Sequence, residues 1–172
     1  MRDAFVLVDV VQAFEHEDGE RLLASFRERH AGFVAALEQA RAEGLSVVYA
    51  NDNFGRWDGD APRLLREAVA GPGGELVEAL EWREGETVVV KPRYSAFDHT
   101  PLELILRELE TERLLLGGLS TEGCVAQTAI DARELGFKVT VLAQACGTAD
   151  ERVEQIALEY LEQVAGAVVQ RG

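Results

Sequence analysis

The feature that most constrains the fold is the alternation of short, almost wholly apolar runs with longer segments of helical periodicity. Strands are expected over residues 4–10, 45–51, 86–92, 113–119 and 137–145, with a short last strand over 167–170. Strands that are apolar on both faces and separated by helices are typical of a parallel sheet covered on both sides. The sequence therefore predicts an α/β fold, a three-layer α/β/α arrangement with about six mostly parallel strands, as a single domain over residues 1–172.

The segments between the strands are expected to be helical, and two of them begin with a capping signal. Helices are expected over residues 32–44, 63–69, 75–82, 100–110, 126–135 and 148–166. Thr100 and Glu103 have the spacing of a capping box, and Pro101 occupies the first helical position. Thr148 and Glu151 have the same spacing at the start of the last helix.

The net charge of the chain restricts its partners. Asp and Glu total 31 against 17 Lys and Arg, which gives a formal charge of −14. A field of this sign repels phosphate backbones and anionic lipid surfaces, so no nucleic-acid and no membrane partner is expected. Asp3 and Asp9 interrupt the N-terminal apolar run where a signal peptide needs an apolar core. The 2 cysteines lack zinc-type spacing and fit a reduced compartment, so a cytoplasmic location is expected.

Three chemically reactive side chains follow three of the expected strands. Asp9 ends the run "FVLVD", Lys91 ends "TVVVK", and Cys124 comes after "RLLLGGLSTEG". In an open parallel sheet, ligands bind outside the carboxyl ends of the strands, so these groups are expected to meet in one crevice. Each alone has an ordinary explanation, as a turn residue, a solvated lysine or a small buried thiol. Their joint occurrence favours a catalytic site.

The combination has a definite chemical use. A helix N-terminus and a nearby cation both lower the pKa of a thiol, so Cys124 at the start of its helix, beside Lys91, is expected to be an activated nucleophile. Asp9 can take the thiol proton and return it to a leaving amine. Backbone N–H groups of the "STEGC" turn can hold a developing oxyanion.

At these residues the chain resembles the isochorismatase-like cysteine hydrolases, a family that includes nicotinamidases and N-carbamoylsarcosine amidohydrolase. The resemblance rests on four segments in order, "LVDVVQAF", "VVYANDNFGRW", "VVVKPRYSAFDHTPLELIL" and "LLLGGLSTEGCV", and it covers nearly the whole chain. It implies a catalytic triad of Asp9, Lys91 and Cys124, and a thioester formed at Cys124. True isochorismatases resemble this family in fold but lack the cysteine, so Cys124 favours hydrolysis of an amide or related C–N bond.

The resemblance has further implications for the site and the assembly. It implies a non-proline cis peptide between Leu119 and Ser120, which aims the N–H of Ser120, with that of Cys124, into an oxyanion hole. It also implies the sheet order 3-2-1-4-5-6 and a homo-oligomer. In that order the strand of Lys91 is two places from the strand of Asp9, about 10 Å away, so the lysine must reach across the strand between them.

The chain departs from the family pattern in two places. Val11 stands where the first motif usually has Gln, and Gln12 follows it. Metal-binding nicotinamidases carry an Asp-x-His pair after the second strand, whereas this chain reads "NDNFGRWDGD" there, with Asp52 but no histidine. The histidines, His16, His30 and His99, are scattered along the chain. No metal and no other cofactor is therefore expected, and nicotinamide becomes a weaker guess for the substrate.

Several other residues are expected near the crevice and predict a small-molecule, amide-type substrate with a flat or apolar group. The predicted pocket residues are Phe14, Asn51, Phe54, Trp57, Tyr94 and Phe97. Arg56 and Arg93 are interpreted first as solvated, with contact to an anionic substrate group as the alternative. Cys146 is interpreted as a small buried residue.

Two other functions are compatible with a doubly wound sheet. A nucleotide- or flavin-binding module carries a glycine fingerprint after the first strand, and "VDVVQAFEHEDG" has no G-x-G-x-x-G. A thiol redox sensor or a non-catalytic binding protein on the same fold is distinguished from an enzyme by amide hydrolysis that is lost in Cys124→Ala.

Overall fold

The computed structural model describes residues 2–172, and its centre is a six-stranded sheet. The strands are β1 (Asp3–Val8), β2 (Ser46–Asp52), β3 (Thr87–Lys91), β4 (Arg113–Leu119), β5 (Lys138–Gly147) and β6 (Val168–Gln170). Their order is β3-β2-β1-β4-β5-β6, and every neighbouring pair is parallel. This order is the one that the family resemblance implied. The direction of the strand order reverses between β1 and β4, and doubly wound sheets bind ligands at this point.

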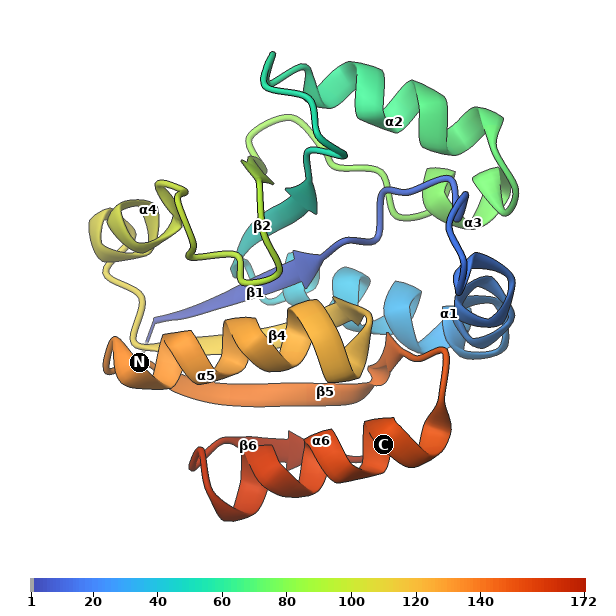
Figure 1. Cartoon of the computed structure of the whole chain (residues 1–172). Helices are drawn as coiled ribbons and strands as arrows, with labels where there is room; N and C mark the ends of the chain where they lie inside the picture. Colours follow the sequence, from blue (N-terminus) through green and yellow to red (C-terminus); the bar gives the residue numbers. More distant parts are fainter. Residues whose placement is uncertain (1) are drawn as a thin grey trace.

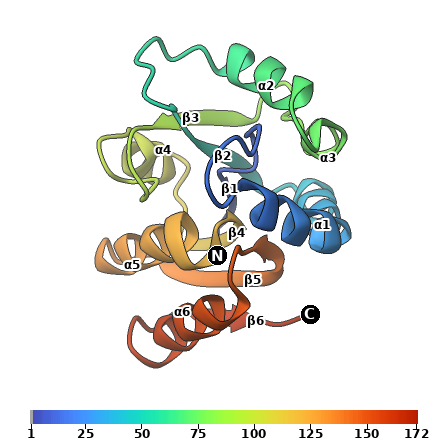
Figure 2. The same cartoon turned by 45° about the vertical axis from the view of Figure 1, so that its right-hand side comes forward.

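Helices cover both faces of the sheet, which gives three layers (Figure 1). They are α1 (Gly19–Ala42), α2 (Ala61–Ala70), α3 (Gly74–Glu78), α4 (Leu102–Glu108), α5 (Ala126–Glu134) and α6 (Glu151–Gln163), and a π-helical turn, η1 (Thr121–Val125), leads into α5. The apolar side chains of α1, α2 and α3 pack in one core cluster, and those of α4, α5 and α6 pack in another. Figure 2 shows β3 and β6 at opposite edges of the sheet.

Two helix starts differ from the sequence prediction. Helix α1 begins at Gly19 rather than near residue 32, because Leu22 and Phe26 extend its buried face by more than three turns among many charged neighbours. Helix α6 begins after Asp150, whose carboxylate accepts hydrogen bonds from the N–H groups of Arg152 and Val153 at 2.9 and 3.2 Å. Thr148 is therefore not the N-cap, and its hydroxyl instead accepts from the N–H of Asp150 at 3.0 Å.

The start of α4 agrees with its predicted cap only in part. The Thr100 hydroxyl accepts a hydrogen bond from the N–H of Leu102 at 3.2 Å, as an N-cap does. The helix itself begins at Leu102, one residue later than expected, with Pro101 as the flanking residue. No capping-box hydrogen bond from Glu103 is found within residues 2–172; its carboxylate accepts from Arg107 at 3.4 Å.

The strand that leads to Cys124 packs tightly against β1 at Gly118. This glycine pairs with Val8, has a φ of 140°, and an added Cβ would lie 2.1 Å from the Val8 carbonyl oxygen. No side chain fits in that space. The glycine is therefore required to bring the end of β4 against the end of β1, and with them Cys124 toward Asp9.

We expect Gly118→Ala to destabilise the protein much more than Gly85→Ala. Gly85 also has a positive φ, 88°, but an added Cβ there meets nothing within 4 Å. The control therefore adds backbone strain of about 1 kcal/mol, whereas Gly118→Ala adds strain and a backbone clash, about 3 kcal/mol or more. Urea unfolding of the two variants measures the difference, and equal losses would contradict the tight β1–β4 packing.

Candidate active site

Asp9 occupies a strained position directly after β1. Its φ is 53°, in the left-handed region, and its N–H donates to the Ala50 carbonyl at 3.0 Å. The side chain is almost completely buried, at 6% exposure, and its Oδ1 accepts from the N–H of Asp52 at 2.7 Å. This turn aims the carboxylate over the carboxyl end of the sheet, and backbone strain of this kind is frequent at functional sites.

Lys91, the last residue of β3, reaches across β2 to join Asp9. Its side chain is fully buried, and its Nζ lies 2.9 Å from Asp9 Oδ2, although their strands are not neighbours. The ammonium also donates to the Arg93 carbonyl at 2.8 Å and lies 3.6 Å from the sulfur of Cys124. The lysine side chain thus spans the distance between the non-adjacent strands β3 and β1.

Cys124 lies in the π-helical turn η1, between the end of β4 and the start of α5. The peptide between Leu119 and Ser120 is cis, as the sequence resemblance implied. The carbonyl of Ser120 accepts from the N–H groups of Gly123 and Val125, at 3.2 Å each. Ser120 and Cys124 both line the same cavity, so the turn presents the thiol and its flanking backbone to the pocket.

The ionisation of the three groups differs from the sequence prediction at the cysteine. Burial raises the pKa of Cys124, the charge of Asp9 raises it further, and Lys91 lowers it by less. The expectation of a lowered thiol pKa is therefore wrong. Burial also raises the pKa of Asp9 above its ordinary value despite the opposing effect of Lys91. The pKa of Lys91 is raised because its carboxylate and thiol neighbours outweigh its burial.

The turn that carries Cys124 is fastened by a buried ion pair. The Thr121 hydroxyl donates to the carboxylate of Glu154 on α6 at 2.6 Å, and Glu154 is only 2% exposed. Arg29 on α1 holds the same carboxylate in two hydrogen bonds, at 2.7 and 2.9 Å. A second link joins the next residue, because Thr148 donates to Glu122 at 2.8 Å. Helices α1 and α6 therefore both fix the position of the turn.

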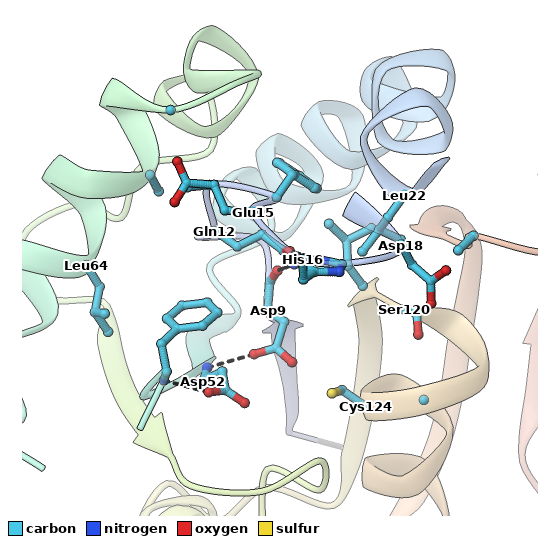
Figure 3. A pocket seen from close by; sticks show the side chains of 18 of the residues that line it. Asp9, Gln12, Glu15, His16, Asp18, Leu22, Asp52, Leu64, Ser120 and Cys124 are labelled. Carbon is cyan, nitrogen blue, oxygen red and sulfur yellow. Dashed lines mark hydrogen bonds between the residues drawn. The ribbon is translucent and has the colours of Figure 1, made fainter. Parts of the chain in front are cut away.

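These groups open on a cavity of about 1090 Å³ that lies outside the carboxyl ends of β1, β2 and β4 (Figure 3). Of the predicted site residues, those that line it are Asp9, Phe14, Phe54, Tyr94, Ser120 and Cys124. Lys91 lies beneath it, with no exposed surface. Phe14 and Phe54 both have positive φ values, 57° and 48°, so the loops that carry them are sharply turned toward the pocket.

Three predicted pocket residues lie elsewhere. Asn51 is 3% exposed, and its amide exchanges two hydrogen bonds with the backbone of Val11, so it holds the loop after β1 instead of lining the cavity. Trp57 is 82% exposed outside the cavity lining. Phe97 stacks on Phe137, with ring centroids 6.2 Å apart, and packs against the core cluster of α4, α5 and α6, outside the cavity lining.

Of the two arginines considered as substrate contacts, Arg56 and Arg93, one lines the cavity and the other does not. Arg56 lines the cavity, but its guanidinium is 2.7 Å from the carboxylate of Glu67. Arg93 is outside the cavity lining, and its nearest acidic partner is Asp98 at 3.4 Å. Cys146 is completely buried, as predicted for a small core residue.

Sequence reasoning missed most of the polar lining. The cavity is also bordered by Gln12, Glu15, His16, Asp18, Asp52, Glu67 and Glu122. Gln12 donates to the Asp9 carbonyl at 2.8 Å, and its amide oxygen lies 3.1 Å from His16 Nε2. These residues could have been found from their position in the sequence, because Gln12 and His16 follow β1 and Asp52 ends β2.

Within residues 2–172, no group of three or more His, Cys, Asp and Glu side chains is placed to hold a metal ion. In the same range, none of the helices has the length and apolar character needed to cross a bilayer.

Fold and site together define an α/β protein with a cysteine beyond the carboxyl ends of the strands of a parallel sheet. Comparison with known proteins identifies its family. The model of the isochorismatase domain matches residues 3–171, so the chain belongs to this family. An isochorismatase family protein of Bacillus subtilis, PncA, is 38% identical over 181 residues, which cover 98% of this chain and 99% of that protein. The maleamate amidohydrolase of Pseudomonas putida is 30% identical over 186 residues, which cover 99% and 84%.

Two solved structures are similar to this chain over nearly its whole length. A nicotinamidase/pyrazinamidase, PncA, from Bacillus subtilis superimposes with a TM-score of 0.80 at 27% identity, covering 99% of this chain and 100% of the other. An N-carbamoylsarcosine amidase from Thermoplasma acidophilum gives a TM-score of 0.70 at 29% identity, covering 99% and 96%.

We expect the Cys124 thiol to react slowly with iodoacetamide, at a rate that rises about tenfold per pH unit without a plateau below about pH 9. Asp9→Asn removes the negative neighbour and leaves Lys91, so the thiol pKa should fall and alkylation at a given pH should accelerate. Lys91→Met should slow it. The rate is measured by mass spectrometry of the Cys124 peptide, with Cys124→Ala as the control. A wild-type plateau near neutral pH would contradict this account.

We expect Thr121→Val to destabilise the protein by about 1–3 kcal/mol, because the buried Glu154 carboxylate loses a donor while the side-chain volume is kept. Thr121→Ser retains the hydroxyl and should lose clearly less. Urea unfolding compares the two variants, and equal losses would show that methyl packing, not the hydrogen bond to Glu154, holds the turn.

Proposed function

We propose that this protein is a cysteine amidohydrolase that cleaves a small amide or related C–N bond through a thioester at Cys124. The observation that carries the proposal is the convergence of three reactive groups from three strand ends, with Lys91 Nζ 2.9 Å from Asp9 and 3.6 Å from Cys124. Amidohydrolases among the relatives support the reaction class. A cysteine nucleophile suits acyl transfer better than cleavage of a vinyl ether.

Asp9 acts as the proton shuttle in the first half of the reaction. Because the resting thiol keeps its proton, attack on the amide carbon is coupled to transfer of that proton to the Asp9 carboxylate. The C–S bond forms as the carbonyl π electrons move to oxygen, and the N–H groups of Ser120 and Cys124 stabilise the oxyanion. Asp9 then gives its proton to the nitrogen, the C–N bond breaks, and ammonia or an amine leaves.

The second half regenerates the enzyme by the reverse use of the same groups. Water attacks the thioester carbon while Asp9 accepts one of its protons. The tetrahedral intermediate collapses, the C–S bond breaks, and the sulfur recovers the proton as the carboxylic acid departs. Lys91 remains a cation throughout, since its pKa is raised, and it stabilises both the carboxylate and the sulfur as negative charge develops.

The substrate in this proposal is a small molecule bound in the cavity, and no cofactor takes part. The homo-oligomer, the cytoplasmic location and the lack of a nucleic-acid partner stay predictions; the last is supported by the net charge of −14.

We expect the protein to release ammonia from at least one member of a panel of primary amides, and Cys124→Ala to abolish the release. Asp9→Asn and Lys91→Met should each lower kcat/KM by about 10²–10⁴-fold. Because Asp9 must be ionised to act as the base, kcat/KM should fall as the pH is lowered through the raised Asp9 pKa. The measurement is a coupled ammonia assay across pH.

Cys146→Ala is the matched control, because this cysteine is buried outside the cavity, and it should keep wild-type turnover. Treatment with EDTA should also leave turnover unchanged, since no metal is expected in the reaction. Hydrolysis that persists in Cys124→Ala would refute the thioester mechanism. A panel without any turnover would favour the alternative of a binding or thiol redox protein on this fold.

A further inference from the structure

The reaction centre has one cation, and all of its hydrogen-bonding capacity is in use. Lys91 directs its Nζ to the Asp9 carboxylate at 2.9 Å, to the Arg93 carbonyl at 2.8 Å and to the Cys124 sulfur at 3.6 Å. An ammonium has three N–H donors, so none is left for a negatively charged group of a substrate. The complete burial of Lys91 beneath the pocket also keeps a ligand from reaching it.

The rest of the cavity offers no other free cation within the part of the chain that the structure describes. Arg56 is the one Lys or Arg side chain in its lining, and it is bound to Glu67. Carboxylates border the same space from several sides (Figure 3). They belong to Asp9, Glu15, Asp52 and Glu122, and to Asp18 and Glu67, which are paired with Arg21 and Arg56. A carboxylate on a substrate would thus lose its hydration without gaining a counter-ion, which is costly.

Asp52 is the second carboxylate at the reaction centre. It ends β2, pairs in register with Lys91, and its Oδ2 lies 3.9 Å from Lys91 Nζ. One lysine is therefore shared by two carboxylates, Asp9 and Asp52, and the surroundings of the protonated thiol keep a net negative charge. The Asp52 side chain is 30% exposed and faces the cavity, with its Oδ1 fixed by the N–H of Phe54 at 2.6 Å.

Aromatic side chains complete this environment. Phe14, Phe54 and Tyr94 line the cavity, and Phe54 and Tyr94 are 51% and 60% exposed. The faces of aromatic rings attract cations, and most strongly cations that are weakly hydrated. The exposed rings and the carboxylate of Asp52 therefore both favour a cationic ligand.

The geometry points to Asp52 as a specificity-determining residue that selects substrates by charge. We infer that the pocket accepts amides whose acyl part is cationic or neutral and rejects amides that carry a carboxylate near the scissile bond. The inference deepens the proposed function and rests on it. It also separates this chain from the relative named for maleamate, which bears a carboxylate, despite 30% identity.

The charge at the sulfur can be measured without hydrolysis, by modifying Cys124 with matched methanethiosulfonates. The 2-(trimethylammonio)ethyl and 2-sulfonatoethyl reagents differ in charge and have the same chain length. Both require the same thiolate, so the ratio of their rates, normalised to 2-mercaptoethanol, cancels the thiol pKa. We expect the normalised rate with the cationic reagent to exceed that with the anionic reagent by at least about tenfold in low salt. High salt should reduce this ratio.

Asp52→Asn should lower this ratio by about tenfold, because it removes one negative charge from the cavity beside Lys91 while keeping the side-chain shape. Glu159→Gln removes an equal charge from an exposed position on α6, outside the cavity lining, and should leave the ratio unchanged. A wild-type ratio near one would overturn the inference. An Asp52→Asn ratio equal to that of the wild type would overturn the role of Asp52.

Turnover gives the second test. Benzamide, 3-(aminomethyl)benzamide and 3-carbamoylbenzoate share one scaffold and carry neutral, positive and negative charge. We expect kcat/KM for the anionic amide to be at least about tenfold lower than for the neutral and cationic amides. Asp52→Asn should reduce this difference in kcat/KM. Preference for the anion would overturn the inference while supporting amide hydrolysis. If none of the three is hydrolysed, the thiosulfonate ratio still decides the charge selection, and the amide panel decides the hydrolase function.

Discussion

The site depends on the ion pair between Lys91 and Asp9. A lysine with no exposed surface is stable in a protein only beside a compensating charge, and removing one partner of a buried pair costs about 3–5 kcal/mol. Because these residues end β3 and β1, their pairing also ties the edge of the sheet to its centre, across β2. The same contact that stabilises the carboxyl end of the sheet therefore brings a carboxylate and a cation together beside the thiol.

The parts of the fold that could be predicted are those that depend on local pattern. Strand β4 was predicted over its actual bounds, because its run of leucines is apolar on both faces and flanked by polar residues. The start of α1 was missed, because its buried Leu22 and Phe26 are diluted by charged neighbours that face solvent. The cap of α6 was assigned to Thr148 because sequence spacing alone does not separate it from Asp150.

The candidate site shows the same division. Asp9, Lys91 and Cys124 could be proposed because each follows a recognisable strand, and the carboxyl ends of parallel strands meet at one edge of the sheet. The order of the strands was implied by the family resemblance. Asn51 and Trp57 were misplaced because side-chain direction after a strand depends on loop conformation, which pattern does not encode. The direction of the Cys124 pKa was also missed. Sequence proximity to a helix start suggested a lowered value, whereas burial and the nearby carboxylate have the larger effect.

The retained proton on Cys124 has a consequence for the enzyme when no substrate is bound. Peroxides and electrophiles attack thiolates, and thiols react with them far more slowly. In the proposed mechanism the thiol gives its proton to Asp9 only as an acyl carbon approaches, so between turnovers it stays in the less reactive, protonated form. Under that mechanism the Asp9 carboxylate, which accepts the thiol proton during turnover, also protects the sulfur from oxidation between catalytic cycles, because its charge raises the thiol pKa.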